Sequence, residues 1–125
     1  MDEYDPDEEP EATAWLSVPE GERLNLVAAY HRRRRISLPS PPLHAAIHAT
    51  VENQVALGEL DVVNALKRLQ NEGLGRHDAI HAIGTVLSEH LVDVLKTGGE
   101  PSREIHKPYF DRLKRLTADE WRRSR

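Results

Sequence analysis

Apolar residues recur at helical spacing along nearly all of this 125-residue chain, and this periodicity restricts its fold more than any other feature. No stretch shows the strict alternation of apolar and polar residues that is typical of a half-buried β-strand. Glycine and proline interrupt the pattern and divide it into about five helical segments. These are approximately residues 19–35, 40–58, 61–73, 75–97 and 102–116, followed by a helical turn that a capping box at Thr117 opens. The sequence predicts an all-α protein, a small helical bundle with up-down connectivity.

The charge distribution separates the N-terminus from the rest of the chain. Residues 1–22 contain nine acidic side chains and no Lys or Arg, whereas the remainder holds seventeen basic against twelve acidic residues. An acidic stretch with few apolar residues buries too little surface to fold alone. We therefore expect residues 1–15 to be an acidic flexible tail that is disordered, and residues 16–125 to form a single helical bundle domain.

Composition excludes several classes of protein. The chain has no cysteine, so disulfides, thiolate nucleophiles, iron–sulfur clusters and cysteine-type zinc sites are ruled out. It has no run of about eighteen apolar residues, which argues against a membrane span. Its acidic N-terminus is unlike a secretory signal. A soluble cytoplasmic protein is expected, and the sequence does not determine its oligomeric state.

Four of the seven histidines form two pairs with the same H-x-x-x-H spacing, His44 with His48 and His77 with His81. Each pair lies near the start of an expected helix. Residues four apart on a helix lie one turn above each other on the same face, so each pair can direct two imidazoles at one point. This arrangement is the sequence feature that indicates chemistry, and the chemistry it indicates is metal binding.

The topology expected from short connections would bring the two pairs together. Consecutive helices joined by short links pack antiparallel, so segments 40–58 and 75–97 would run parallel with their histidines at one level. A helix N-terminus disfavours positive charge, which lowers the pKa of histidine and favours the neutral, metal-binding form. The predicted metal ligands are His44, His48, His77 and His81. Gly84 is expected to permit close approach of a neighbouring helix.

Other residues extend this prediction. Glu52 and His31 are further candidate ligands, and Asp78 and Gln54 are candidate acceptors that would orient the ligand rings. Imidazole ligands without thiolate favour a transition metal, zinc or iron most of all. We expect a regulatory, structural or small-molecule-binding role in preference to catalysis.

A wider set of residues matches the pattern of a known family. The matching residues are His44, His48, Gln54, His77, His81, Pro101 and Tyr109, within about residues 41–116. In these the chain resembles a family of small, uncharacterised bacterial proteins known as a domain of unknown function. The family pattern has adjacent Glu and Gln, whereas here Asn53 separates Glu52 from Gln54. The resemblance implies a helical protein with a candidate metal site and supplies no activity.

Two hydrolase patterns are alternatives. The His77-Asp78 dipeptide resembles the core of HD-type metal phosphohydrolases, in which His44 and a later aspartate, Asp93 or Asp111, would complete the site and Arg32–Arg35 would bind phosphate. The segment 77–81 also resembles a zincin motif with Asp in place of Glu, and Glu100 or Glu104 would then be the third ligand.

Besides the hydrolases, the other alternative is a protein- or nucleic-acid-binding module without metal. Its candidate basic surface comprises Arg32–Arg35, Arg112, Lys114, Arg115, Arg122, Arg123 and Arg125. A pI near 6.0 and an aromatic content of 5% argue against nucleic acid. A protein partner that binds through the acidic tail is the other form of this alternative.

Overall fold

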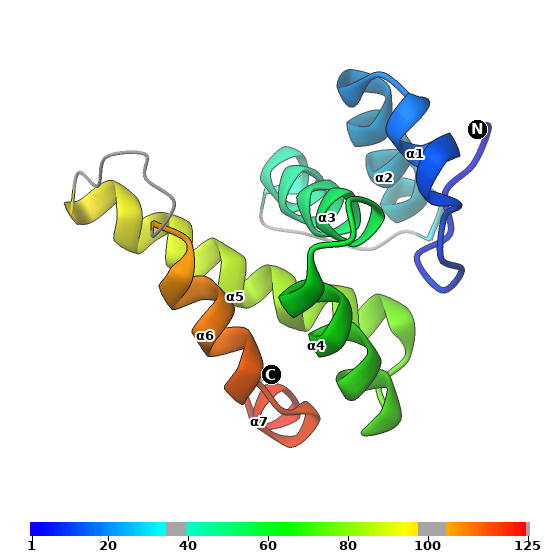
Figure 1. Ribbon diagram of the computed structural model, residues 1–125. Coiled ribbons are helices and arrows are strands. Elements are labelled where there is room, and N and C mark those ends of the chain that lie inside the picture. The colour runs from blue at the N-terminus through cyan, green and yellow to red at the C-terminus, as the bar shows by residue number, and fades with distance from the viewer. Residues whose placement is uncertain (35–39, 98–104, 125) are drawn as a thin grey trace.

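The computed structural model describes residues 1–34, 40–97 and 105–124, and the regular secondary structure in this part of the chain is helical (Figure 1). The helices are α1 (Ala12–Ser17), α2 (Glu20–Arg33), α3 (Pro41–Ala56), α4 (Leu60–Asn71), α5 (Arg76–Thr97), α6 (Lys107–Arg115) and α7 (Ala118–Arg123). The all-α prediction is confirmed, and α1 is a helix that the sequence analysis did not predict. None of the helices in the described ranges is long and apolar enough to cross a membrane.

Local sequence explains where the helices begin. Proline occupies the first turn of α3 and of α6, where its missing N–H leaves no hydrogen bond unmade. The Thr117 hydroxyl accepts a hydrogen bond from the Glu120 amide at 3.1 Å, which confirms the predicted cap of α7. Helix α4 begins at Leu60, one residue before the start expected at about residue 61. Its N-cap is Glu59, and Asp61 lies within the first turn, where its negative charge interacts favourably with the positive end of the helix dipole.

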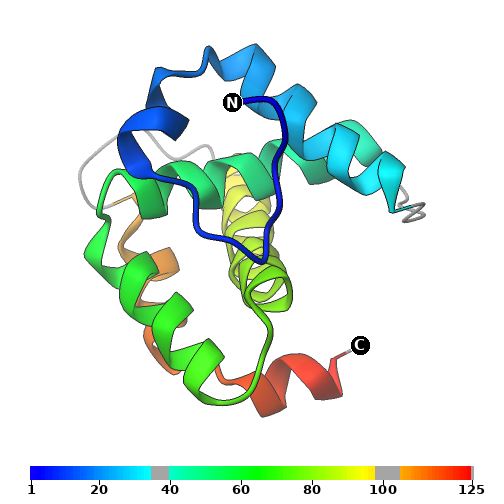
Figure 2. The same cartoon turned by 90° about the vertical axis from the view of Figure 1, so that its right-hand side faces the viewer.

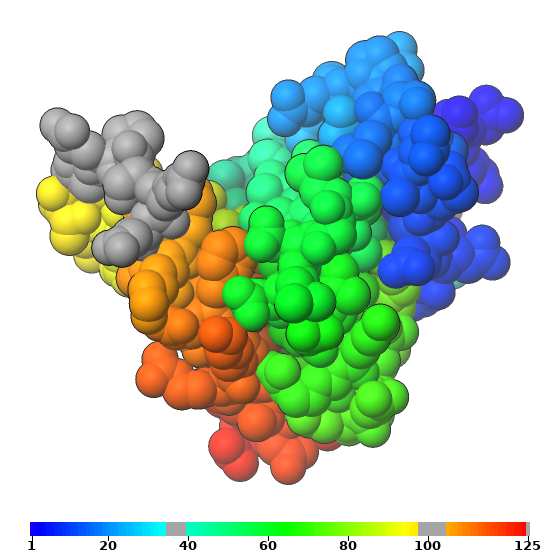
Figure 3. Space-filling view, in the orientation of Figure 1, coloured from blue at the N-terminus to red at the C-terminus, as the bar shows by residue number. Residues whose placement is uncertain are grey.

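Helix α3 lies between two apolar clusters. Its residue Val51 belongs to the larger cluster, which α4, α5, α6 and α7 complete. Its residues Ala45 and Ala49 belong to the smaller cluster, with Tyr4, Trp15 and side chains of α2. Figure 3 shows α4 and α6 side by side on one face of the molecule, and both helices contribute buried residues to the larger cluster. The histidines of α3 therefore lie where the two clusters meet.

Helices α3 and α5 cross steeply. Figure 2 shows α3 along its length and α5 nearly end-on, so the parallel alignment expected for these two helices is not what the structure has. Gly84 of α5 lies at the crossing, where an added Cβ would come within 3.1 Å of Ile47 Cγ2. This contact confirms the predicted close approach at Gly84, and it brings the first halves of both helices within reach of one point.

The structure differs from the expectation of a disordered N-terminal tail. Tyr4 is 2% exposed, Pro6 and Trp15 are fully buried, and the Pro6 carbonyl accepts a hydrogen bond from Arg76 at 2.9 Å. Figure 2 shows this segment passing over α3 to the start of α5 before it enters α1. The acidic side chains of residues 1–15 are exposed except for the half-buried Asp5, while the buried rings of Tyr4 and Trp15 supply apolar surface that a count of charges does not reveal.

Candidate metal centre

Four imidazoles converge from three helices. They belong to His31 on α2, His44 and His48 on α3, and His81 on α5, and we call them the histidine cluster. One ring nitrogen from each lies within 4.8 Å of the other three. Zinc with bonds of about 2.0–2.1 Å to four nitrogens holds them roughly 3.4 Å apart. The nitrogens of the cluster are therefore up to about 1.4 Å further apart than four zinc-bound nitrogens would be.

His31 is positioned as a metal ligand usually is. Its Nδ1 lies 2.8 Å from the carbonyl oxygen of Val27, one turn earlier on α2, so Nδ1 carries the hydrogen and donates it. The other nitrogen, Nε2, is buried and has no hydrogen-bond partner among the residues the structure describes. A histidine that donates from one nitrogen to a carbonyl presents the lone pair of the other nitrogen to a metal.

His48 is held by a network that reaches the N-terminal segment. The Tyr4 hydroxyl donates to the carboxylate of Glu52 and lies 2.8 Å from His48 Nε2. Because the hydroxyl hydrogen goes to the carboxylate, its oxygen accepts from His48 Nε2–H. That assignment leaves Nδ1 of His48 as the lone-pair nitrogen, and Nδ1 is buried without a hydrogen-bond partner in the described ranges.

Arg76 anchors the same network. Its Nη1 and Nη2 donate to Glu52 Oε2 and Oε1 at 2.7 and 2.8 Å, and Glu52 is 1% exposed. Both oxygens of Glu52 are thus engaged, which places this residue behind His48 instead of in the ligand position that the sequence analysis considered. Burial and the Glu52 charge raise the pKa of Tyr4 well above its ordinary value, so the phenol stays protonated. We call Tyr4, Glu52 and Arg76 the outer network.

Changing Tyr4 to phenylalanine tests the outer network. The variant loses the oxygen that receives His48 Nε2–H, so His48 is no longer fixed in one tautomer and orientation. We expect metal affinity to fall about 10- to 100-fold, the usual effect of losing a group that orients a ligand. Competition with a chromogenic chelator measures the change. Tyr30→Phe is the matched control because it keeps the ring that packs against Tyr4 and His31 and removes a hydroxyl that makes no hydrogen bond to the described residues of the outer network. An equal loss there would contradict the assignment.

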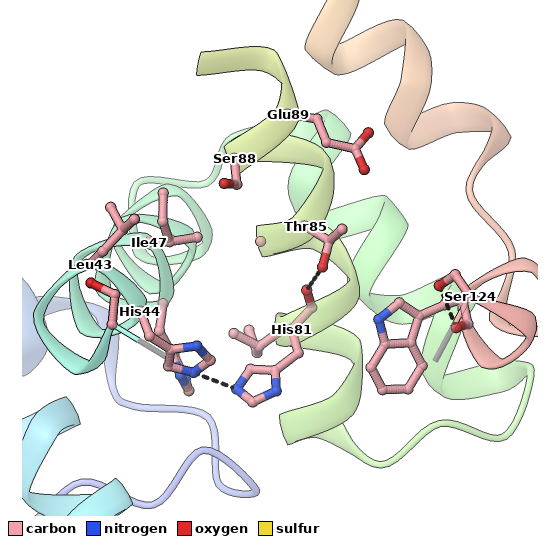
Figure 4. Close-up of a pocket in the computed structure, with 13 residues that line it drawn as sticks. Leu43, His44, Ile47, His81, Thr85, Ser88, Glu89 and Ser124 are labelled. Atoms are coloured by element: carbon pink, nitrogen blue, oxygen red, sulfur yellow. Dashed lines mark hydrogen bonds between the residues drawn. The ribbon is translucent and has the colours of Figure 1, made fainter. Parts of the chain in front are cut away.

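His44 and His81 form the accessible side of the cluster. Their Nε2 atoms lie 3.0 Å apart, and Figure 4 shows the two rings meeting edge to face across the α3–α5 crossing. Both residues are half-buried, whereas His31 and His48 are buried. Two lone-pair nitrogens at this distance require a shared hydrogen or a cation between them.

His77 lies beside the histidine cluster. Its ring centroid is 4.2 Å from that of His81 and 5.3 Å from that of His48, and its Nε2 is buried without a hydrogen-bond partner in the described part of the chain. Its nitrogens are not among the four that lie within 4.8 Å of one another. The structure thus brings together three of the four predicted ligands with His31, and holds His77 next to them.

Burial favours the neutral form of three imidazoles at this site, those of His44, His48 and His77. Burial, followed by the neighbouring His31 and His77, lowers the pKa of His44 to about 4. Burial lowers the pKa of His48 well below its ordinary value, with a smaller contribution from the other imidazoles, and burial also lowers the pKa of His77. The imidazoles of His44, His48 and His77 are therefore uncharged at neutral pH, the form that binds metal. The main cause is burial and not the helix dipole on which the sequence analysis relied.

Other candidate residues lie elsewhere. The Gln54 side-chain oxygen accepts from the Tyr109 hydroxyl at 2.8 Å, and Asp78 acts on the pKa of His77. Asp111 pairs with Lys107 at the surface, and the described group at ligand distance contains no aspartate of the phosphohydrolase pattern. Glu100, Glu104, Pro101 and residues 35 and 125 lie outside the described residues. The other two histidines, His90 and His106, lie apart from the cluster, with His90 Nε2 3.2 Å from His106 Nδ1.

Comparison with known proteins gives no match: no family model matches the chain, and neither the curated proteins nor the solved structures contain a significant match. The resemblance to a bacterial domain of unknown function stays a prediction. The function of this chain must therefore be inferred from the geometry of the site.

Proposed function

We propose that this protein binds a transition metal ion, zinc or iron, through His31, His44, His48 and His81. The observation that carries the proposal is the convergence of four ring nitrogens from three helices within 4.8 Å. His77 is a candidate fifth ligand because its buried Nε2 adjoins the same space. With imidazole ligands alone the site suits zinc or iron better than magnesium or calcium, which prefer oxygen.

The energetics of burial support a bound cation. Three ring nitrogens, on His31, His48 and His77, are buried without a hydrogen-bond partner among the described residues. Each such group costs about 1–3 kcal/mol of folding free energy when it stays unsatisfied. Coordination would satisfy these lone pairs and would offset the cost of placing so many imidazoles together.

Elemental analysis of protein purified without chelator tests the proposal. We expect about one zinc or iron ion per chain, and chelator-treated protein should melt at a lower temperature and recover when metal is returned. At a free metal concentration a thousand times the Kd, the added stability is about 4 kcal/mol. Protein that carries no metal and whose melting neither zinc nor ferrous iron shifts would refute the proposal.

The half-buried side of the site bears on its role. A closed shell of four buried imidazoles would be purely structural, whereas His44 and His81 are reachable from one side. We therefore propose a regulatory or small-molecule-binding role in which the metal has an accessible coordination position.

A further inference from the structure

A cavity of about 550 Å³ adjoins the accessible side of the histidine cluster. His44, His48 and His81 line it, and Ile47, Ile80 and Trp121 contribute much of its apolar wall. Figure 4 shows His44 and His81 together at one side of this cavity, with Thr85 and Ser88 of α5 further along it. Its volume lies within the range of about 300–1,000 Å³ that is usual for small-molecule sites.

The exposure of the four imidazoles fixes the direction from which a ligand would reach the metal. His31 of α2 is buried with its ring edge-on to Tyr30, and His48 of α3 is buried with its ring edge-on to Tyr4. His44 and His81 are half-buried and line the cavity. An additional coordination position on a metal held by these four rings would therefore face the cavity.

Charge balance favours an anion at that position. Four neutral imidazoles leave the two positive charges of the metal uncompensated. The buried carboxylate of Glu52 is already paired with Arg76, and Glu89, the acidic residue in the cavity wall, is paired with Arg112. The charges of Asp5, Asp7 and Asp78 raise the pKa of His77 against the larger effect of burial, and neither His77 nor these three carboxylates line the cavity. An exogenous carboxylate would supply the missing negative charge in a partly desolvated site, where the attraction is strong.

We propose that the cavity binds a small carboxylate with an apolar body. One carboxylate oxygen coordinates the metal between His44 and His81, and the body lies along Ile47, Ile80 and Trp121. This inference rests on the metal binding proposed above. The apolar wall explains why a carboxylate with a hydrocarbon body should be preferred over a bare inorganic anion.

The test uses the full chain loaded with Co²⁺, a spectroscopic substitute for zinc, and probes it with n-alkanoates from acetate to octanoate. Each added methylene should tighten binding by up to about fourfold, as expected for burial of a CH₂ group. The visible spectrum of Co²⁺ should change on titration, and n-alkanols of the same length should bind at least tenfold more weakly. Binding that is independent of chain length, an unchanged spectrum, or equal affinity of metal-free protein for octanoate would each overturn the inference.

A pair of variants separates cavity from metal. Ser88→Phe fills the cavity without altering a ligand and should weaken octanoate at least tenfold while Co²⁺ still binds. Val92→Phe is the matched control, one turn further along α5 and outside this cavity, and should leave octanoate binding unchanged. Equal octanoate affinity in both variants would overturn the inference. Metal loading is measured first: failure to load refutes the proposed function, whereas loading without carboxylate binding refutes this inference alone.

Discussion

Replacing His31 with alanine is expected to weaken metal binding on the order of 100-fold or more. A site of four ligands that binds with about 10–16 kcal/mol loses roughly a quarter of that free energy with each ligand. His31 is the most informative position because its Nδ1 already donates to the Val27 carbonyl and its Nε2 is buried without a described partner. Isothermal titration calorimetry of the metal-free variant with zinc and ferrous iron measures the loss.

The control for His31→Ala is His90→Ala. His90 is also a buried imidazole, 4% exposed, but it lies with His106 and Tyr109, away from the cluster. We expect the His90→Ala variant to bind metal with the same affinity as the wild type. His77→Ala should lose less than His31→Ala, about tenfold, because His77 is a candidate fifth ligand whose nitrogens are not among the four that lie within 4.8 Å of one another. An unchanged affinity in His31→Ala would contradict the site, and a larger loss in His77→Ala would return His77 to the ligand set.

Most of the histidine cluster could be predicted from the sequence, because the spacing of residues along a helix is local information. Three of the converging residues, His44, His48 and His81, follow from H-x-x-x-H spacing on α3 and α5. His31 has no histidine four residues away on α2. The sequence therefore made it a further candidate, and the packing of α2 on α3 was needed to identify it as one of the four. The helix arrangement that brings the rings together also differs from expectation. Helices α3 and α5 cross steeply instead of running parallel, and the close contact of Gly84 with Ile47 allows this crossing.

The outer network could not be predicted from spacing. Tyr4 and His48 are 44 residues apart, and Arg76 and Glu52 are 24 apart, with no periodic pattern joining them. The acidic composition of residues 1–15 favoured disorder, because composition counts charges and does not reveal where one aromatic side chain can be buried. Tyr4 and Trp15 were the available signals, as the two aromatic residues of that stretch.

Replacing Arg76 with methionine is expected to lower the free energy of unfolding of the metal-free protein by about 3–5 kcal/mol, the cost of leaving one charge of a buried ion pair without its partner. Arg76 is 6% exposed, and it holds both Glu52 and the Pro6 carbonyl. The same substitution should therefore loosen the N-terminal segment from α3 and α5. Urea unfolding measures the stability, and hydrogen exchange of the amides around Tyr4 measures the loosening.

The matched control is Lys107→Met, which removes an ion pair of similar length at the surface. Lys107 Nζ lies 2.8 Å from Asp111 Oδ2, but their side chains are 69% and 42% exposed. Water screens such a pair, and its loss should cost about 0.5 kcal/mol or less. The double variant Glu52→Leu/Arg76→Met should lose less than Arg76→Met, because no unpaired charge stays buried. If Arg76→Met is as mild as Lys107→Met, the pair does not hold the outer network together, and the orientation of His48 must have another source.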